Sequence, residues 1–113
     1  MIGHVHLAAI DNENPASISP LVIGLLRREL APDNTLITDD FSMLAIARNP
    51  GGITGAGVAS LNAGIDMILI SYDFDQYYPA MHALLQAERD GSLRPGVLRE
   101  SDRRLALTKP LNE

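Results

Sequence analysis

Thr35-Leu36-Ile37-Thr38-Asp39-Asp40-Phe41-Ser42-Met43 joins a short apolar run to two adjacent carboxylates and then to a helix-like stretch. The apolar run predicts a strand over residues 35–38, with both aspartates at its C-terminal end. In parallel α/β folds, the loops that follow the C-terminal ends of strands carry the chemistry. Asp39 and Asp40 are therefore the first candidates for a catalytic side chain.

Two further stretches have the strand pattern, residues 2–7 and residues 66–71. The midpoints Val5, Leu36 and Met67 are separated by 31 residues in both intervals, and a (β/α)8 barrel of about 250 residues spends about 31 on each unit. The sequence predicts an α/β fold of parallel βα units, with residues 1–113 forming a single incomplete domain. Three strands leave two unpaired sheet edges, so a small flavodoxin-like sandwich or an assembly of copies also fits.

Helical patterns follow each predicted strand. Ser19 can cap a first helix that has Pro20 in its first turn. The leucines of this helix form an apolar stripe, and Arg27, Arg28 and Glu29 are expected to face water. Further helices are expected over residues 54–62, 76–89 and 97–107.

The composition narrows the class of protein. The chain is 46% apolar and 20% charged, as in globular domains, and its formal net charge is −5. The negative charge disfavours nucleic acid and anionic membranes as partners. The chain has no cysteine, which excludes disulfides and thiolate metal sites. No apolar run approaches the roughly 20 residues of a membrane span, and no signal peptide is visible, so a cytoplasmic protein is expected.

The two aspartates cannot share one role. Neighbouring side chains of an extended chain point to opposite faces, so only one carboxylate can act on a given bond. The other is expected to cap the following helical turn or to bond the loop. A retaining glycosidase needs a second carboxyl about 5 to 5.5 Å from its nucleophile, which another strand or loop must supply.

The ordered motifs resemble a known family. Thr38-Asp39-Asp40-Phe41-Ser42-Met43 is similar to the S-D-D-L-x-M signature of family 3 glycoside hydrolases, in the β-N-acetylhexosaminidase branch. Met1-Ile2-Gly3-His4-Val5 resembles its M-x-A-H-V strand, and Ala63-Gly64-Ile65-Asp66-Met67-Ile68-Leu69 its A-G-x-D-M-x-L strand. Residues 15–19, 26–30 and 103–107 resemble further segments of the same branch, so the likeness covers nearly the whole chain.

The resemblance implies a fold and an activity. The chain would correspond to the last three units of a (β/α)8 TIM barrel, the C-terminal portion of the catalytic barrel. Asp39 would be the nucleophile of retaining hydrolysis of a terminal β-N-acetylglucosaminide, such as a muropeptide in cell-wall recycling, and His4 and Met43 would line the sugar pocket. No metal or organic cofactor is implied. The family's K-H-F-P-G-H-G and D-x-H motifs are absent from this sequence, so little or no activity is expected of the isolated chain.

Two alternatives remain open. His4 and His6, with Asp39 or Asp73, could bind a divalent metal in an amidohydrolase-like enzyme. The chain could also be a non-enzymatic α/β module that associates with itself, or one that docks a complementing barrel fragment to bury its sheet edges.

Overall fold

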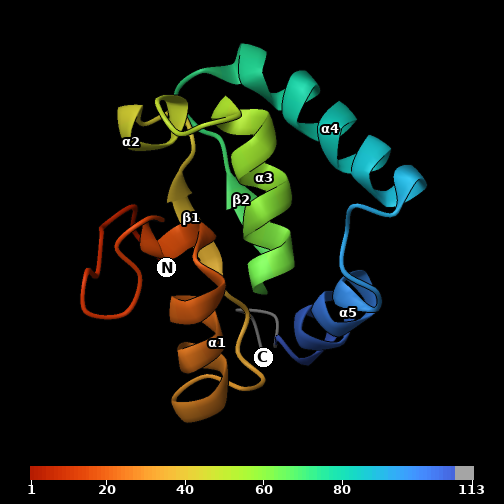
Figure 1. The fold of residues 1–113 in the computed structure, drawn as a ribbon. Helices are drawn as coiled ribbons and strands as arrows, with labels where there is room; N and C mark the ends of the chain where they lie inside the picture. Colours follow the sequence, from red (N-terminus) through yellow and green to blue (C-terminus); the bar gives the residue numbers. More distant parts are fainter. Residues whose placement is uncertain (109–113) are drawn as a thin grey trace.

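The computed structural model describes residues 1–108. The elements in chain order are η1 (Ala16–Ile18), α1 (Pro20–Glu29), β1 (Ile37–Asp40), α2 (Leu44–Ala47), α3 (Gly52–Ala63), β2 (Met67–Leu69), η2 (Phe74–Gln76), α4 (Tyr77–Asp90) and α5 (Val97–Leu107). Figure 1 shows α2 at one end of the two strands and α5 at the other.

The strands form a small parallel sheet in which β1 pairs with β2. Ile2 extends this sheet by a single parallel bridge to Thr38. The Ile2 N–H donates to Ile37 O at 2.7 Å, and the Asp39 N–H donates to Ile2 O at 2.8 Å. The expected parallel arrangement of three segments is therefore present.

The predicted strand over residues 2–7 is wrong beyond Ile2. The chain leaves the sheet there, because the His4 side chain turns toward Ser17 and the backbone of Asp40. The Val5 carbonyl then accepts from Ala16 N–H at 2.8 Å instead of from a strand. The first segment is thus held by the loop before α1 rather than by a ladder of β bonds.

The helices lie close to their expected positions. Ser19 caps α1 as predicted, and its Oγ accepts from Val22 N–H at 3.1 Å with Pro20 at the first helical position. The helix predicted over residues 97–107 matches α5, and those over residues 54–62 and 76–89 match α3 and α4 within two residues. No helix within residues 1–108 has the length and apolar character needed to cross a bilayer.

Two apolar clusters fix the helices against the strands. One joins η1, α2, α3 and α4 around the fully buried Phe41 and Ile46. The other packs Ile23 of α1 against Leu36 and Ile65. Leu36 directly precedes β1, and Ile65 lies two residues before β2. The residues directly before and directly after β1, Leu36 and Phe41, are thereby packed into these two clusters.

Arg27 is predicted to face water, but the structure turns its side chain inward. Its guanidinium donates to the carbonyl oxygens of Gly64 and Ala31 and pairs with Asp66 at 2.7 Å. Asp66 is enclosed, and its other oxygen lies 2.8 Å from the nearly buried Arg104 of α5. An amphipathic helix pattern places arginine outside, but a long stem can bring the charged group to a buried partner.

Candidate active site

Asp39 lies at the C-terminal end of β1, as predicted, but inside the strand, because β1 runs over Ile37–Asp40 and not over residues 35–38. Its N–H bonds Ile2 O, and its Oδ1 accepts from the Asp40 N–H at 2.8 Å. The side chain is partly exposed. Within residues 1–108, no cation pairs with Asp39 and no donor bonds its Oδ2. One oxygen is therefore anchored to the backbone, and the other accepts no hydrogen bond from the described residues.

The register of β1 changes beside Asp39. Ile37 pairs with Met67 and Asp40 pairs with Leu69, so β1 has one more residue than β2 between these two pairs. The Leu69 N–H donates to the Thr38 Oγ1 at 3.1 Å, so a side-chain hydroxyl accepts in place of a ladder carbonyl. Such irregularities occur next to active sites, where they re-aim a side chain.

Asp40 has the structural role expected of one member of the pair. Its Oδ1 accepts from the N–H groups of Ser42 at 2.9 Å and Ser71 at 3.1 Å, and its Oδ2 accepts from Ser71 Oγ at 2.7 Å. Burial alone would raise the pKa of this carboxyl, but the bonds donated by Ser42 and Ser71 outweigh burial and lower the pKa to about 2. Asp40 is thus a charged group whose oxygens are already occupied.

His4 is buried beneath the C-terminal ends of β1 and β2, which together form the rim of the site. Its Nδ1 lies 2.7 Å from Ser17 Oγ, and its Nε2 donates to the Asp40 carbonyl at 2.9 Å. The ring also meets Phe41 edge-on, with centroids 5.5 Å apart. Both ring nitrogens are engaged with the protein, so in this arrangement His4 supports the backbone of Asp40.

The metal alternative finds little support in this geometry. His6 is exposed on a segment without regular strand pairing, and the nitrogens of His4 already have partners. Within the described part of the chain, no three His, Cys, Asp or Glu side chains gather as a metal site would require.

Met43 stands at the rim, where it precedes the first residue of α2 with 46% of its surface exposed. Its neighbour Ser42 bonds the loop after β2, because the Ser42 Oγ accepts from the Asp73 N–H at 3.0 Å. The structure therefore brings Asp39, His4 and the Met43 loop to one end of the sheet.

Sequence reasoning missed the serines of this site. Ser17 bonds His4, and Ser42 and Ser71 join the two strand ends. The available signal was the position of Ser71, which lies 31 residues after Asp40, the same interval that separates the strand midpoints. Equivalent positions in neighbouring βα units lie side by side at one edge of a sheet.

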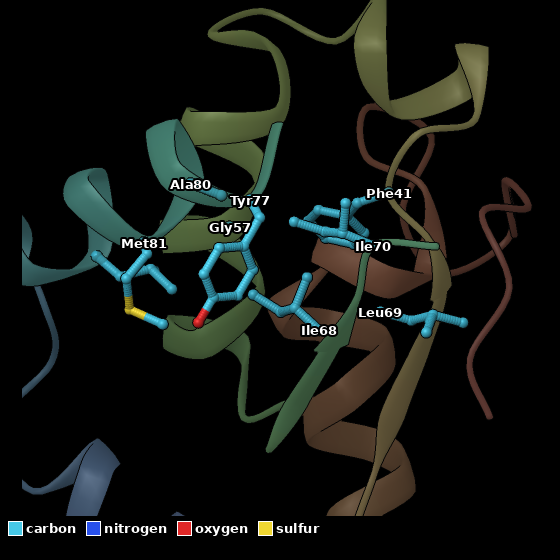
Figure 2. A pocket seen from close by; sticks show the side chains of 9 residues that line it. Phe41, Gly57, Ile68, Leu69, Ile70, Tyr77, Ala80 and Met81 are labelled. Atoms are coloured by element: carbon cyan, nitrogen blue, oxygen red, sulfur yellow. The ribbon is translucent and has the colours of Figure 1, made fainter. Parts of the chain in front are cut away.

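An apolar cavity is a separate feature of the structure. Figure 2 shows it between α3, α4 and the end of β2, with Ile68, Ile70, Tyr77 and Met81 around it. Its volume is about 250 Å³, and no aspartate, glutamate or histidine lines it. This lining thus offers no carboxylate or imidazole for nucleophilic or acid–base chemistry, so the candidate site is the rim at Asp39 and not this cavity.

Comparison with known proteins identifies a family. Residues 1–107 match the model of the glycosyl hydrolase family 3 N-terminal domain. The beta-hexosaminidase LpqI of Mycobacterium tuberculosis is 31% identical over 118 aligned positions, which cover 99% of this chain and 30% of LpqI. A beta-hexosaminidase of Nitrosomonas eutropha is 42% identical over 76 positions, 66% of this chain and 21% of that protein.

A solved structure agrees with this match. The family 3 beta-N-acetylglucosaminidase of Paenibacillus sp. superposes with a TM-score of 0.79 at 37% identity. The superposition covers 88% of this chain and 19% of that structure. The chain thus spans less than a third of the length of each of these relatives.

Proposed function

The chain belongs to glycosyl hydrolase family 3, and from this premise we propose that it supplies the nucleophile of a retaining β-N-acetylhexosaminidase. The observation that carries the proposal is Asp39 at the strand end, with Oδ1 held by a backbone N–H and Oδ2 without a donor among residues 1–108. A nucleophilic carboxylate needs a fixed direction and a free oxygen.

In the proposed reaction, Asp39 attacks the anomeric carbon of a terminal β-N-acetylglucosaminide. The bond to the leaving oxygen breaks as a proton is delivered to that oxygen, and a covalent glycosyl-enzyme forms. Water then attacks the same carbon and releases Asp39, and the group that delivered the first proton takes a proton from this water. The beta-hexosaminidase names of the relatives support this substrate class.

The proposal assigns these residues to the last three units of a barrel. The proton donor and the groups that grip the sugar would then come from barrel units outside this sequence. A nucleophile without a proton donor gives little stabilisation of the transition state. The isolated chain is therefore expected to be inactive, and the complete barrel to depend on Asp39.

A chimera tests the proposal. Residues 1–113 replace the matching segment of M. tuberculosis LpqI, and turnover of 4-nitrophenyl β-N-acetylglucosaminide is measured for the chimera and for the isolated chain. The isolated chain should show no turnover. The chimera should be active and should lose its activity in Asp39→Ala, with azide restoring turnover as an α-glycosyl azide, the mark of a missing nucleophile.

Asp75→Ala is the matched control, because Asp75 is an exposed carboxylate in η2 with no proposed role. It should leave turnover unchanged. The proposal is contradicted by turnover in the isolated chain, by undiminished activity of the Asp39→Ala chimera, or by a folded chimera that is inactive with Asp39 in place.

A further inference from the structure

We propose that Asp40 is a positioning residue that aims Asp39 through a latch between the ends of β1 and β2. The latch consists of Asp40, Ser42, Ser71 and the backbone of Asp73. Its importance for catalysis rests on the proposed function of Asp39, whereas its geometry can be tested without any turnover.

The latch joins the loops that follow the two strands. Ser71 donates to Asp40 through both its hydroxyl, at 2.7 Å, and its N–H, at 3.1 Å. In the opposite direction, Asp73 donates its N–H to Ser42 Oγ at 3.0 Å. The Phe41 N–H adds a bond to Leu69 O at 2.9 Å. Each loop therefore bonds the other, and the bonds to Asp40 are strengthened by its charge.

Asp40 passes this restraint to Asp39 through the peptide between them. The N–H of that peptide is the donor that holds Asp39 Oδ1. On the following peptide, the Asp40 carbonyl accepts from His4 Nε2. On the preceding side, the Asp39 N–H donates to Ile2 O. A rotation of the linking peptide would move both the donor and the carboxylate that it orients.

The register change explains why the strand needs a latch. One extra residue lies between the paired positions Ile37 and Asp40, so the ladder with β2 is interrupted beside Asp39. An interrupted ladder leaves the local backbone less constrained. The side-chain bonds of Thr38 and Asp40 to the chain of β2 and its loop take over this role.

The carboxylates of Asp39 and Asp40 thus have different roles at the rim. Within the described part of the chain, the bonds to the Asp40 side chain come from Ser42 and Ser71, and they engage both of its oxygens. The lowered pKa of Asp40 keeps these acceptors charged at neutral pH. Within residues 1–108, Asp39 Oδ2 accepts no hydrogen bond, and Ser71 restrains Asp39 through its bonds to Asp40.

Nuclear magnetic resonance of the full 113-residue chain tests the latch. Three-bond couplings to the Asp39 carboxyl carbon report its χ1 rotamer, and hydrogen exchange reports the Asp40 N–H that bonds Asp39 Oδ1. Ser71→Ala removes the hydroxyl donor and should average the Asp39 rotamers. It should also speed Asp40 exchange about tenfold relative to α3, as expected for the loss of one bond to a charged group.

Ser92→Ala is the matched control, because Ser92 also donates its hydroxyl and its N–H to an aspartate, Asp90, away from the strand ends. It should leave the Asp39 signals unchanged. Ser71→Thr keeps a hydroxyl and should therefore keep the Asp39 rotamer of the native chain. A general structural disturbance at residue 71 would instead average the Asp39 rotamers in Ser71→Thr as well. Asp40→Asn provides a second perturbation of the same latch and should also average the Asp39 rotamers.

The proposal is overturned if Ser71→Ala and Asp40→Asn leave the Asp39 couplings and the relative exchange of Asp40 as in the native chain. It is also overturned if exchange rises equally in α3, which would mean a general loss of stability. Loss of Asp39 order in Ser71→Ala, together with an LpqI chimera whose activity survives Asp39→Ala, would support the latch while rejecting the nucleophile.

Discussion

Removal of the Asp66 carboxylate should destabilise the fold severely. Asp66 Oδ2 accepts from Arg27 at 2.7 Å and from the Leu36 N–H at 2.8 Å, and Oδ1 accepts from Arg104 Nε at 2.8 Å. Burial alone would raise the pKa of Asp66, but these donated bonds outweigh burial and lower it. Asp66→Ala leaves the buried Arg104 charge and the Leu36 N–H without their partner.

The expected loss follows from this geometry. Removing one partner of a buried ion pair costs about 3 to 5 kcal/mol, a large share of the roughly 5 to 15 kcal/mol that stabilises a domain. Arg27 keeps its carbonyl partners, so most of the loss arises at Arg104 and Leu36. Asp66→Asn retains an acceptor oxygen and should cost less than Asp66→Ala.

Asp33→Ala is the control. Asp33 pairs with Arg103 at 2.7 Å, the same distance as in the Asp66–Arg27 pair, but both side chains are more than half exposed. Exposed pairs contribute about 0 to 1 kcal/mol. Urea unfolding followed by circular dichroism should show a large loss for Asp66→Ala and almost none for Asp33→Ala. Equal losses, or a loss below about 1 kcal/mol for Asp66→Ala, would refute the reasoning.

Two further predictions concern Gly64 and the pH dependence of the latch. Gly64 ends α3 at φ 110°, so Gly64→Ala should cost about 1 to 2 kcal/mol of left-handed strain, measured by urea unfolding. Gly3→Ala is its control, because a Cβ there meets nothing within 4 Å, and a comparable loss in Gly3→Ala would contradict this reasoning. The pKa of Asp40 is lowered to about 2 from 3.8, so its contribution to stability is complete above about pH 4 and is lost as the pH falls toward 2. Carboxyl carbon titration should give that midpoint, and Ser71→Ala should raise it; an unchanged midpoint in Ser71→Ala would count against the hydroxyl bond.

The sequence predicts the local elements well where a single residue determines them. Ser19 and Pro20 mark the start of α1, and Gly64 and Gly91 mark the ends of α3 and α4. Each is a local requirement of helix capping or of backbone conformation, so no knowledge of the distant chain is needed. The βα interval likewise places Asp39 at a strand end.

The sequence does not predict features that depend on distant partners. The shortness of the first strand depends on the bonds of His4 to Ser17 and to the Asp40 carbonyl. Leu7 then forms an antiparallel bridge with Asp11 and not with β1. The inward course of Arg27 depends on Asp66, which lies 39 residues further along the chain. The bonds of Ser71 to Asp40 depend on the register between two strands. None of these follows from hydrophobic periodicity.

The anchors at the two ends of β1 also have a practical meaning for protein engineering. Leu36 is tied to Asp66 at one end and Asp40 to Ser71 at the other, a separation of about 13 Å along an extended strand. Sites this far apart usually act independently, so stability can be altered around Asp66 separately from the proposed restraint on Asp39 around Ser71. Substitutions in the three residues between these anchors would affect both properties at once.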